Sequence, residues 1–139
     1  MSKDLSPRRQ ARELALQVLF QTEFLDAINI EESLNFFKGV LDANNETYQY
    51  AQELCSSVVA NRNQLDEIIQ QSSDNWKISR MALVDLNILR IATYEIRLSN
   101  GSVPPKSSID EAVDLAKKYS TTDSSGFING ILDRVLKNT

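Results

Sequence analysis

Residues 81–98 read MALVDLNILRIATYEIRL, and this stretch decides the fold class. When it is wound as a helix at about 100° per residue, its apolar side chains cover too wide an arc for one buried stripe. The side chains concerned are Val84, Ile88, Leu89, Ile91, Ala92, Tyr94 and Ile96. A helix that is apolar on nearly every side is packed by neighbours from several directions. We therefore expect residues 81–98 to form the central helix of a bundle, with Ser79 as its cap.

The sequence before this stretch also shows helical periods and no convincing alternation of a strand. Ser6 and Pro7 suit the cap and the first position of a helix that is expected to run to about Phe24. Its core stripe contains Ala11, Leu14, Ala15, Val18 and Leu19. Two more helices are expected over residues 30–40 and 46–71, and the polar residues 61–63 can break the second of them.

After the central helix, residues 100–105 contain a glycine and two prolines and predict a loop. Ser108 and Glu111 match the capping box and predict the start of the next helix, and Asp123 is expected to cap a last one. Gly126 and Gly130 in that last helix are interpreted as a place of close helix approach, with ligand contact at the exposed Gly126 backbone as the alternative. The chain is thus predicted to be all-α, with about seven helices in one domain over residues 1–139.

The composition argues against most enzymatic chemistry. The 139 residues contain no histidine, a single cysteine and four glycines, so zinc sites, the usual nucleophile–base pairs and phosphate loops lack their residues. Adjacent carboxylates on a helix point about 100° apart and do not converge on one proton or metal. Cys55 lies on an apolar stripe and is interpreted as a core residue. We expect a binding protein without metal or cofactor.

No run of eighteen apolar residues and no secretory signal is present in the sequence. These two features predict a cytoplasmic protein that does not insert into a membrane.

Charge is concentrated at one end of the chain. Residues 1–12 contain Lys3, Arg8, Arg9 and Arg12 against Asp4, whereas the whole chain has a net charge of −4. Arginine pairs with phosphate and stacks on bases, so this cluster points to contact with a polyanion such as RNA; a solvated helix start is the alternative. Leu16 and Phe20 fall outside the core stripe of the same helix and suggest a second contact face, for a partner.

Four stretches of the chain resemble the bacterial transcription antitermination factors of the NusB family. They are residues 8–20 (RRQARELALQVLF), 76–96 (WKISRMALVDLNILRIATYEI), 103–119 (VPPKSSIDEAVDLAKKY) and 123–133 (DSSGFINGILD). The resemblance implies two small helical bundles packed together, without enzymatic activity, that bind the boxA element of ribosomal RNA leader transcripts. It also implies that NusE is a partner, and that the pair joins RNA polymerase with other Nus factors to sustain ribosomal RNA synthesis.

The resemblance also assigns residues to these roles. Arg8, Arg9 and Arg12 fall on the RNA-binding segment of the family, and Phe127 matches an aromatic residue near the RNA, where core packing is the alternative role. Asp123 opens the same segment as Phe127. The remaining assignments are Lys117 and Lys118, which extend the basic edge or are plain surface lysines, and Phe20, Leu16 and Asp85, which are expected at the NusE contact.

Two other functions stay open at this point. The chain is also similar to the NusB-like RNA-binding domain that occurs fused to ribosomal RNA cytosine methyltransferases. Alternatively, it is a helical module that forms a homodimer through its apolar strip, with the arginines at the interface.

Overall fold

The structure is a computed structural model that describes residues 6–24, 29–41, 44–74 and 76–139, with the backbone alone for residues 37–41. Seven α-helices, one short 3₁₀ helix and no strand are present in this part of the chain, which confirms the all-α prediction. The elements are α1 (Pro7–Gln21), α2 (Ile30–Leu41), α3 (Asn45–Ala60), α4 (Arg62–Gln71), η2 (Ile78–Arg80), α5 (Leu83–Arg97), α6 (Pro105–Tyr119) and α7 (Thr122–Lys137). None of these helices is long and apolar enough to cross a membrane.

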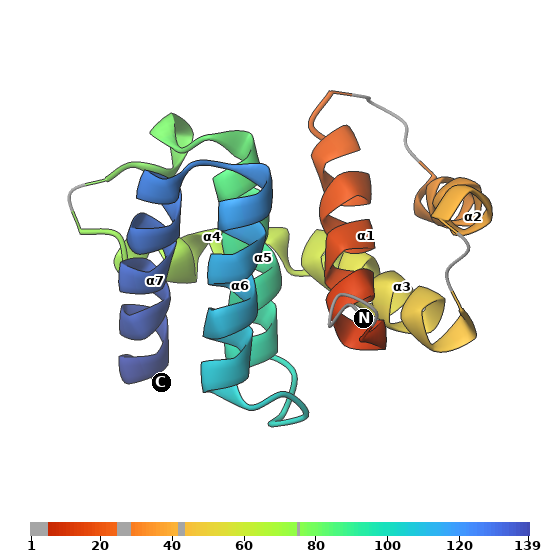
Figure 1. The fold of residues 1–139 in the computed structure, drawn as a ribbon. Helices are drawn as coiled ribbons and strands as arrows, with labels where there is room; N and C mark the ends of the chain where they lie inside the picture. Colours follow the sequence, from red (N-terminus) through yellow and green to blue (C-terminus); the bar gives the residue numbers. More distant parts are fainter. Residues whose placement is uncertain (1–5, 25–28, 42–43, 75) are drawn as a thin grey trace. The chain divides into compact units, whose positions relative to one another are not determined.

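The chain divides into two compact units, residues 1–60 and residues 61–139. The first unit consists of α1, α2 and α3, and the second contains α4 to α7 (Figure 1). The border falls at the expected break, because Asn61 leaves helical geometry with φ −113° and ψ 19°. This agrees with the expectation of two small helical bundles.

In the first unit α1 packs on both α2 and α3. The core stripe predicted for α1 is confirmed, because each of its five residues is at most 2% exposed. Leu16, which we expected outside this stripe, is only 3% exposed, so that expectation is wrong. The helix also ends earlier than predicted: the Thr22 hydroxyl donates to the Leu19 carbonyl oxygen at 2.6 Å, and the helix closes at Gln21.

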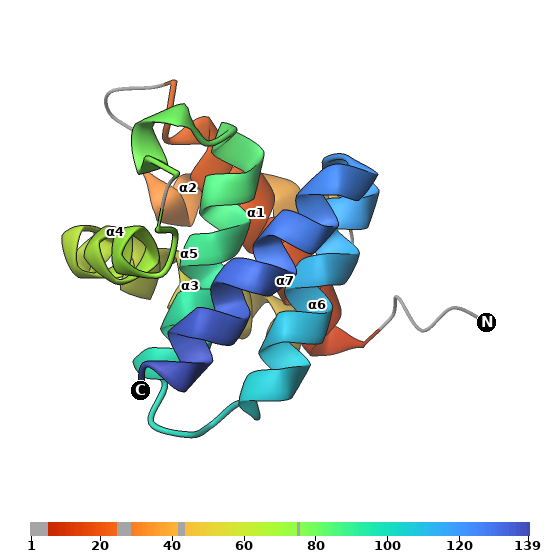
Figure 2. The ribbon, with the colours of Figure 1, turned by 90° about the vertical axis from the view of Figure 1, so that its left-hand side faces the viewer.

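In the second unit α5 is the central helix, as its sequence predicts, and α4, α6 and α7 all pack on it. Every residue from 85 to 95 is buried. Figure 2 shows α6 and α7 side by side, and the two are in direct contact. The buried Arg90 guanidinium is satisfied by Asp66 of α4, with Nε to Oδ1 at 2.7 Å and Nη2 to Oδ2 at 2.9 Å. This bidentate ion pair links α5 to α4.

Two of the predicted helix caps are wrong because prolines and a 3₁₀ turn set the helix starts instead. Ser79 lies within η2, and α5 begins four residues later, at Leu83. Pro105, whose fixed φ suits the first helical position, starts α6, so Ser108 lies inside the helix and is buried there.

The cap of α7 also differs from the prediction. Thr121 precedes the helix, and its side-chain oxygen accepts a hydrogen bond from the Ser124 backbone N–H at 3.1 Å. Asp123 therefore does not cap α7. It lies in the first turn, where a carboxylate still interacts favourably with the helix dipole.

Candidate nucleic-acid interface

Two of the three arginines at the start of α1 lie against a tyrosine of α3. The Arg8 guanidinium lies over the Tyr50 ring at 4.3 Å from its centroid, and that of Arg12 lies at 5.9 Å. Arg8 is exposed and Arg9 half-buried, whereas Arg12 is only 5% exposed. The structure therefore presents Arg8 and Arg9 to solvent, while Arg12 supports the cluster from within. Tyr50 was not singled out from the sequence, because its contact depends on the packing of α1 on α3.

A small cavity of about 220 Å³ lies beside Arg8. Its lining residues are Pro7, Arg8, Glu46, Gln49, Tyr50 and Glu53. The two glutamates place negative charge next to Arg8, so the local potential is lower than three arginines in sequence suggest. An incoming phosphate would meet Arg8 and Arg9 first.

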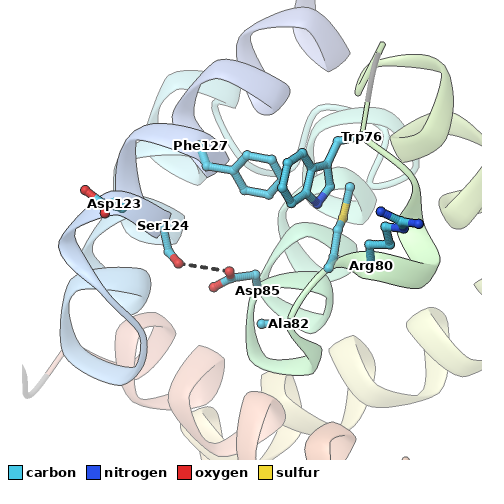
Figure 3. Close-up of a pocket in the computed structure, with 8 residues that line it drawn as sticks. Trp76, Arg80, Ala82, Asp85, Asp123, Ser124 and Phe127 are labelled. Carbon is cyan, nitrogen blue, oxygen red and sulfur yellow. Dashed lines mark hydrogen bonds between the residues drawn. The ribbon is translucent and has the colours of Figure 1, made fainter.

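The second feature is an exposed aromatic pair in the other unit. Trp76, just before η2, and Phe127 of α7 meet edge to face, with ring centroids 5.7 Å apart and planes at 68° (Figure 3). Trp76 is 50% exposed and Phe127 is half-buried. The core of α7 is filled by Ile128, Ile131 and Leu132. Phe127 is therefore not a core residue in the sense of the alternative role, and Trp76 is a neighbour that sequence reasoning missed.

A cavity of about 320 Å³ opens beneath this pair. Its lining residues are Trp76, Arg80, Met81, Ala82, Asp85, Asp123, Ser124 and Phe127. Asp85 is 6% exposed, and its Oδ2 accepts a hydrogen bond from the Ser124 hydroxyl at 2.9 Å (Figure 3). Its Oδ1 has no hydrogen-bond partner among the described residues. This oxygen is buried as well as unpaired, which is costly for a carboxylate.

The remaining predicted positions lie at helix ends. Asp123 is exposed at the start of α7, in the cavity beneath the aromatic pair. Lys117 and Lys118 are exposed in the last turn of α6, where cations complement the helix dipole. The Lys118 ammonium also lies 5.4 Å from the centroid of the Tyr119 ring. The two lysines are available for contact and also have a purely local explanation.

Phe20 at the end of α1 is half-buried and meets Phe24 edge to face at 5.1 Å. Phe24 is 63% exposed, which makes it one of the few large apolar side chains on the described surface. These two rings form an apolar patch. Leu16 has almost no accessible surface of its own and can contribute only by supporting this patch from beneath.

The described ranges also show how the acidic side chains and the cysteine are placed. No group of three or more metal-ligating side chains occurs among the described residues. Burial raises the pKa of Cys55 to about 12, and its thiol donates to the Ala15 carbonyl oxygen at 3.9 Å. A thiol with so high a pKa stays protonated and unreactive, which agrees with its interpretation as a core residue.

An arginine-rich helix start and an exposed aromatic pair on a helical scaffold are features of an all-helical binding module. The model of the NusB family matches residues 9–137 of the chain. The chain belongs to the NusB family.

Curated relatives and solved structures agree with this assignment. Transcription antitermination protein NusB of Bdellovibrio bacteriovorus is 50% identical over 133 residues, covering 96% of this chain and 97% of that protein. The NusB of Geotalea uraniireducens is 44% identical, with 94% of each chain covered. The structure is similar to that of T. maritima NusB, with a TM-score of 0.85, 34% identity and coverage of 95% and 92%. A crystal structure of antitermination factors NusB and NusE in complex with double-stranded RNA matches with a TM-score of 0.85, 27% identity and coverage of 96% and 98%.

Proposed function

We propose that the chain is a transcription antitermination factor that binds the boxA element of ribosomal RNA leader transcripts together with NusE. One observation supports the proposed binding of RNA: Trp76 and Phe127 form an aromatic pair that is accessible to solvent beside a cavity. Single-stranded RNA is held in proteins by stacking of unpaired bases on aromatic rings and by cations at its phosphates. Phe127 supplies the ring, the exposed Arg8 supplies one cation and the half-buried Arg9 supplies a second.

Each proposed RNA residue has a distinct role. Arg8 and Arg9 neutralise phosphates, and Arg12 holds the Tyr50 side of the same cluster in place. Phe127 stacks on a base. Asp123 accepts a hydrogen bond from a base edge in the adjoining cavity. Lys117 and Lys118, in the last turn of α6, supply further phosphate contacts, and they add affinity without sequence preference.

Two places in the structure support the proposed binding of NusE. Phe20, supported by Leu16, offers the apolar patch at the end of α1, and apolar aromatic patches are typical anchors of protein interfaces. The second place is Asp85, whose buried Oδ1 has no hydrogen-bond partner among the described residues and would have to be uncovered before a donor of NusE could reach it. A solved NusB–NusE complex is what supports the choice of NusE for this chain.

The wider role follows from this adaptor function. As one domain over residues 1–139, the protein would join other Nus factors on RNA polymerase in the cytoplasm and would catalyse no reaction itself. The Bdellovibrio relative, which is 50% identical, is a transcription antitermination protein, which favours the adaptor over the methyltransferase-domain alternative. Homodimer formation through the patch at Phe20 stays a prediction, and sedimentation velocity over a range of concentrations tests it.

The Phe127→Ala variant tests the proposed binding of RNA. Loss of one stacked base should weaken boxA binding about tenfold, because stacking contributes roughly 1–3 kcal/mol per base. Phe36→Ala is the matched control, since Phe36 is 64% exposed on α2 and belongs to neither site. The assay is fluorescence anisotropy with labelled single-stranded boxA and with the same strand in a duplex. Equal affinity of wild type and Phe127→Ala for the single strand, or a preference for the duplex, would contradict the proposal.

A further inference from the structure

A second cavity lies on the other side of the aromatic pair. It has a volume of about 330 Å³ and is lined by Ser73, Asp74, Trp76, Gly126, Phe127, Gly130, Ile131 and Arg134. The two cavities share Trp76 and Phe127 and no other lining residue. The aromatic pair is therefore the wall between them. Each volume is at the lower end of the range of roughly 300–1,000 Å³ that small-ligand pockets occupy.

Two glycines of α7 keep this second cavity open. Gly126 and Gly130 are one helical turn apart and so lie on the same face of α7. A Cβ atom added at either position would meet no atom within 4 Å, so the interpretation as a place of close helix approach is wrong. Glycine in a helix interior costs about 1 kcal/mol relative to alanine. At these two positions the absence of a side chain leaves an open groove and does not serve tight helix packing.

Trp76 stays exposed on a backbone that is held in place. The Gln70 side chain spans the segment, with its Nε2 donating to the Trp76 carbonyl oxygen at 3.0 Å and its Oε1 accepting from the Ile78 N–H at 3.0 Å. The Trp76 N–H itself donates to the Ser73 carbonyl oxygen at 2.9 Å. A large apolar ring that is half exposed on a fixed backbone loses little conformational entropy when a flat ligand stacks on it.

A guanidinium lies at the end of the groove. Arg134 Nη1 donates to the Ser72 carbonyl oxygen at 2.7 Å and lies 3.6 Å from Asp74 Oδ2. The Arg134 side chain is 48% exposed. Since a guanidinium is a fork of several N–H donors, Arg134 is oriented by these contacts and can still donate to a phosphate. Asp74 lowers the positive potential of Arg134 only in part, because both side chains are about half exposed and solvent screens the pair.

We propose that the groove beside Gly126 and Gly130 is a second base subsite, in which a neighbouring unpaired base of the bound RNA stacks on Trp76 while Arg134 contacts its phosphate. The inference rests on the proposed function and deepens it. The bound strand then straddles the aromatic pair, with one base on the Phe127 side and the next on the Trp76 side.

A substitution at Gly130 distinguishes an effect on RNA affinity from an effect on protein stability. Gly130→Leu fills the groove and also improves helix propensity, so the variant should be at least as stable as the wild type while binding boxA RNA about tenfold more weakly. Asn129→Leu is the matched control, because Asn129 is exposed on the same helix and lines neither cavity. As the only tryptophan of the chain, Trp76 also reports directly: its fluorescence should be quenched when unlabelled boxA RNA binds to the wild type.

Abasic positions in the RNA then locate the base. When single bases of boxA are removed in turn, the affinity difference between the wild type and Gly130→Leu should vanish at one position and persist at the others. Wild-type affinity in Gly130→Leu together with unchanged Trp76 fluorescence would overturn the second subsite, and a normal effect of Phe127→Ala in the same assay would leave the proposed function standing. Loss of NusE binding in Gly130→Leu with RNA binding intact would also overturn it, because the groove would then take protein. Absence of boxA binding by the wild type would instead refute the proposed function itself.

Discussion

The Tyr50→Leu substitution tests how much the orientation of Arg8, as distinct from its charge, contributes to boxA binding. Arg8 lies 4.3 Å from the Tyr50 ring centroid, within cation–π distance, whereas Arg12 at 5.9 Å is at its limit. Because Arg8 is exposed, its contact contributes roughly 0.5–1 kcal/mol. Losing it should weaken boxA binding about two- to fivefold, since Arg8 would have to be ordered by the RNA instead of by the ring.

The dependence of affinity on salt distinguishes this effect from loss of charge. Tyr50→Leu keeps every cation, so the slope of log affinity against log salt concentration should equal that of the wild type. Arg8→Ala should lower that slope by about 0.7, the value for one phosphate contact on a single strand. Anisotropy titrations at four salt concentrations measure both quantities at 25 °C, after circular dichroism has verified that each variant is folded.

Tyr48→Leu is the control for the loss of a tyrosine from α3. The Tyr48 hydroxyl donates to Asn35 Oδ1 at 2.8 Å, and Tyr48 does not line the cavity beside Arg8. Its replacement should leave RNA affinity unchanged. If Tyr50→Leu and Tyr48→Leu bind boxA equally well, the ring does not orient the arginines. If Tyr50→Leu lowers the salt slope, the substitution has removed phosphate contacts instead of only releasing Arg8 from the ring. That result would contradict the prediction.

Three further predictions concern the core and the partner surface. Asp66→Asn should lower the free energy of unfolding by about 3–5 kcal/mol in urea denaturation, because Arg90 is buried and would lose its carboxylate; a change below 1 kcal/mol would mean that water replaces it. Since burial holds the pKa of Cys55 near 12, the thiol should resist alkylation at pH 8 and react only on unfolding. The protonated Cys55 thiol contributes to stability below about pH 9, the pKa of cysteine in the unfolded chain, and this contribution declines as the pH rises toward 12. Rapid labelling of the native protein at pH 8 would disprove the burial of the thiol. Phe20→Asp should reduce NusE binding at least tenfold by calorimetry and spare RNA binding by the isolated protein, and the opposite pattern would exchange the two surfaces.

Periodicity predicted the helices well because it depends on which faces are buried. The wide apolar arc of residues 81–98 placed α5 at the centre of its bundle, and the stripe of α1 was correct at all five positions. Helix starts were predicted less well. Ser79, Ser108 and Asp123 are all good capping residues, yet Ala82, Pro104 and Thr121 occupy the capping positions. Local propensity allows several starts within a few residues, and tertiary packing selects one.

The candidate sites were only partly visible in the sequence. Arginine clustering can be read directly, whereas the Tyr50 ring beneath Arg8 depends on how α1 packs on α3. Trp76 lies within one of the stretches that resemble the NusB family, yet its sequence context predicts no role for it, because nothing local shows that its ring stays exposed beside Phe127. Gly130 shows the same limit. A glycine spaced by four residues indicates either close packing or an open groove, and only the absence of neighbouring atoms decides between them.

We propose that this chain reads boxA RNA jointly with NusE, and a single binding experiment tests this proposal. Labelled single-stranded boxA and a scrambled strand of equal length are titrated with the protein at two salt concentrations, with and without NusE from the same organism. We predict a preference for boxA that tightens when NusE is added, because the two ligands occupy one adaptor. Equal and salt-sensitive binding of both strands, unaffected by NusE, would contradict the claim and would reduce the site to a basic edge without sequence recognition.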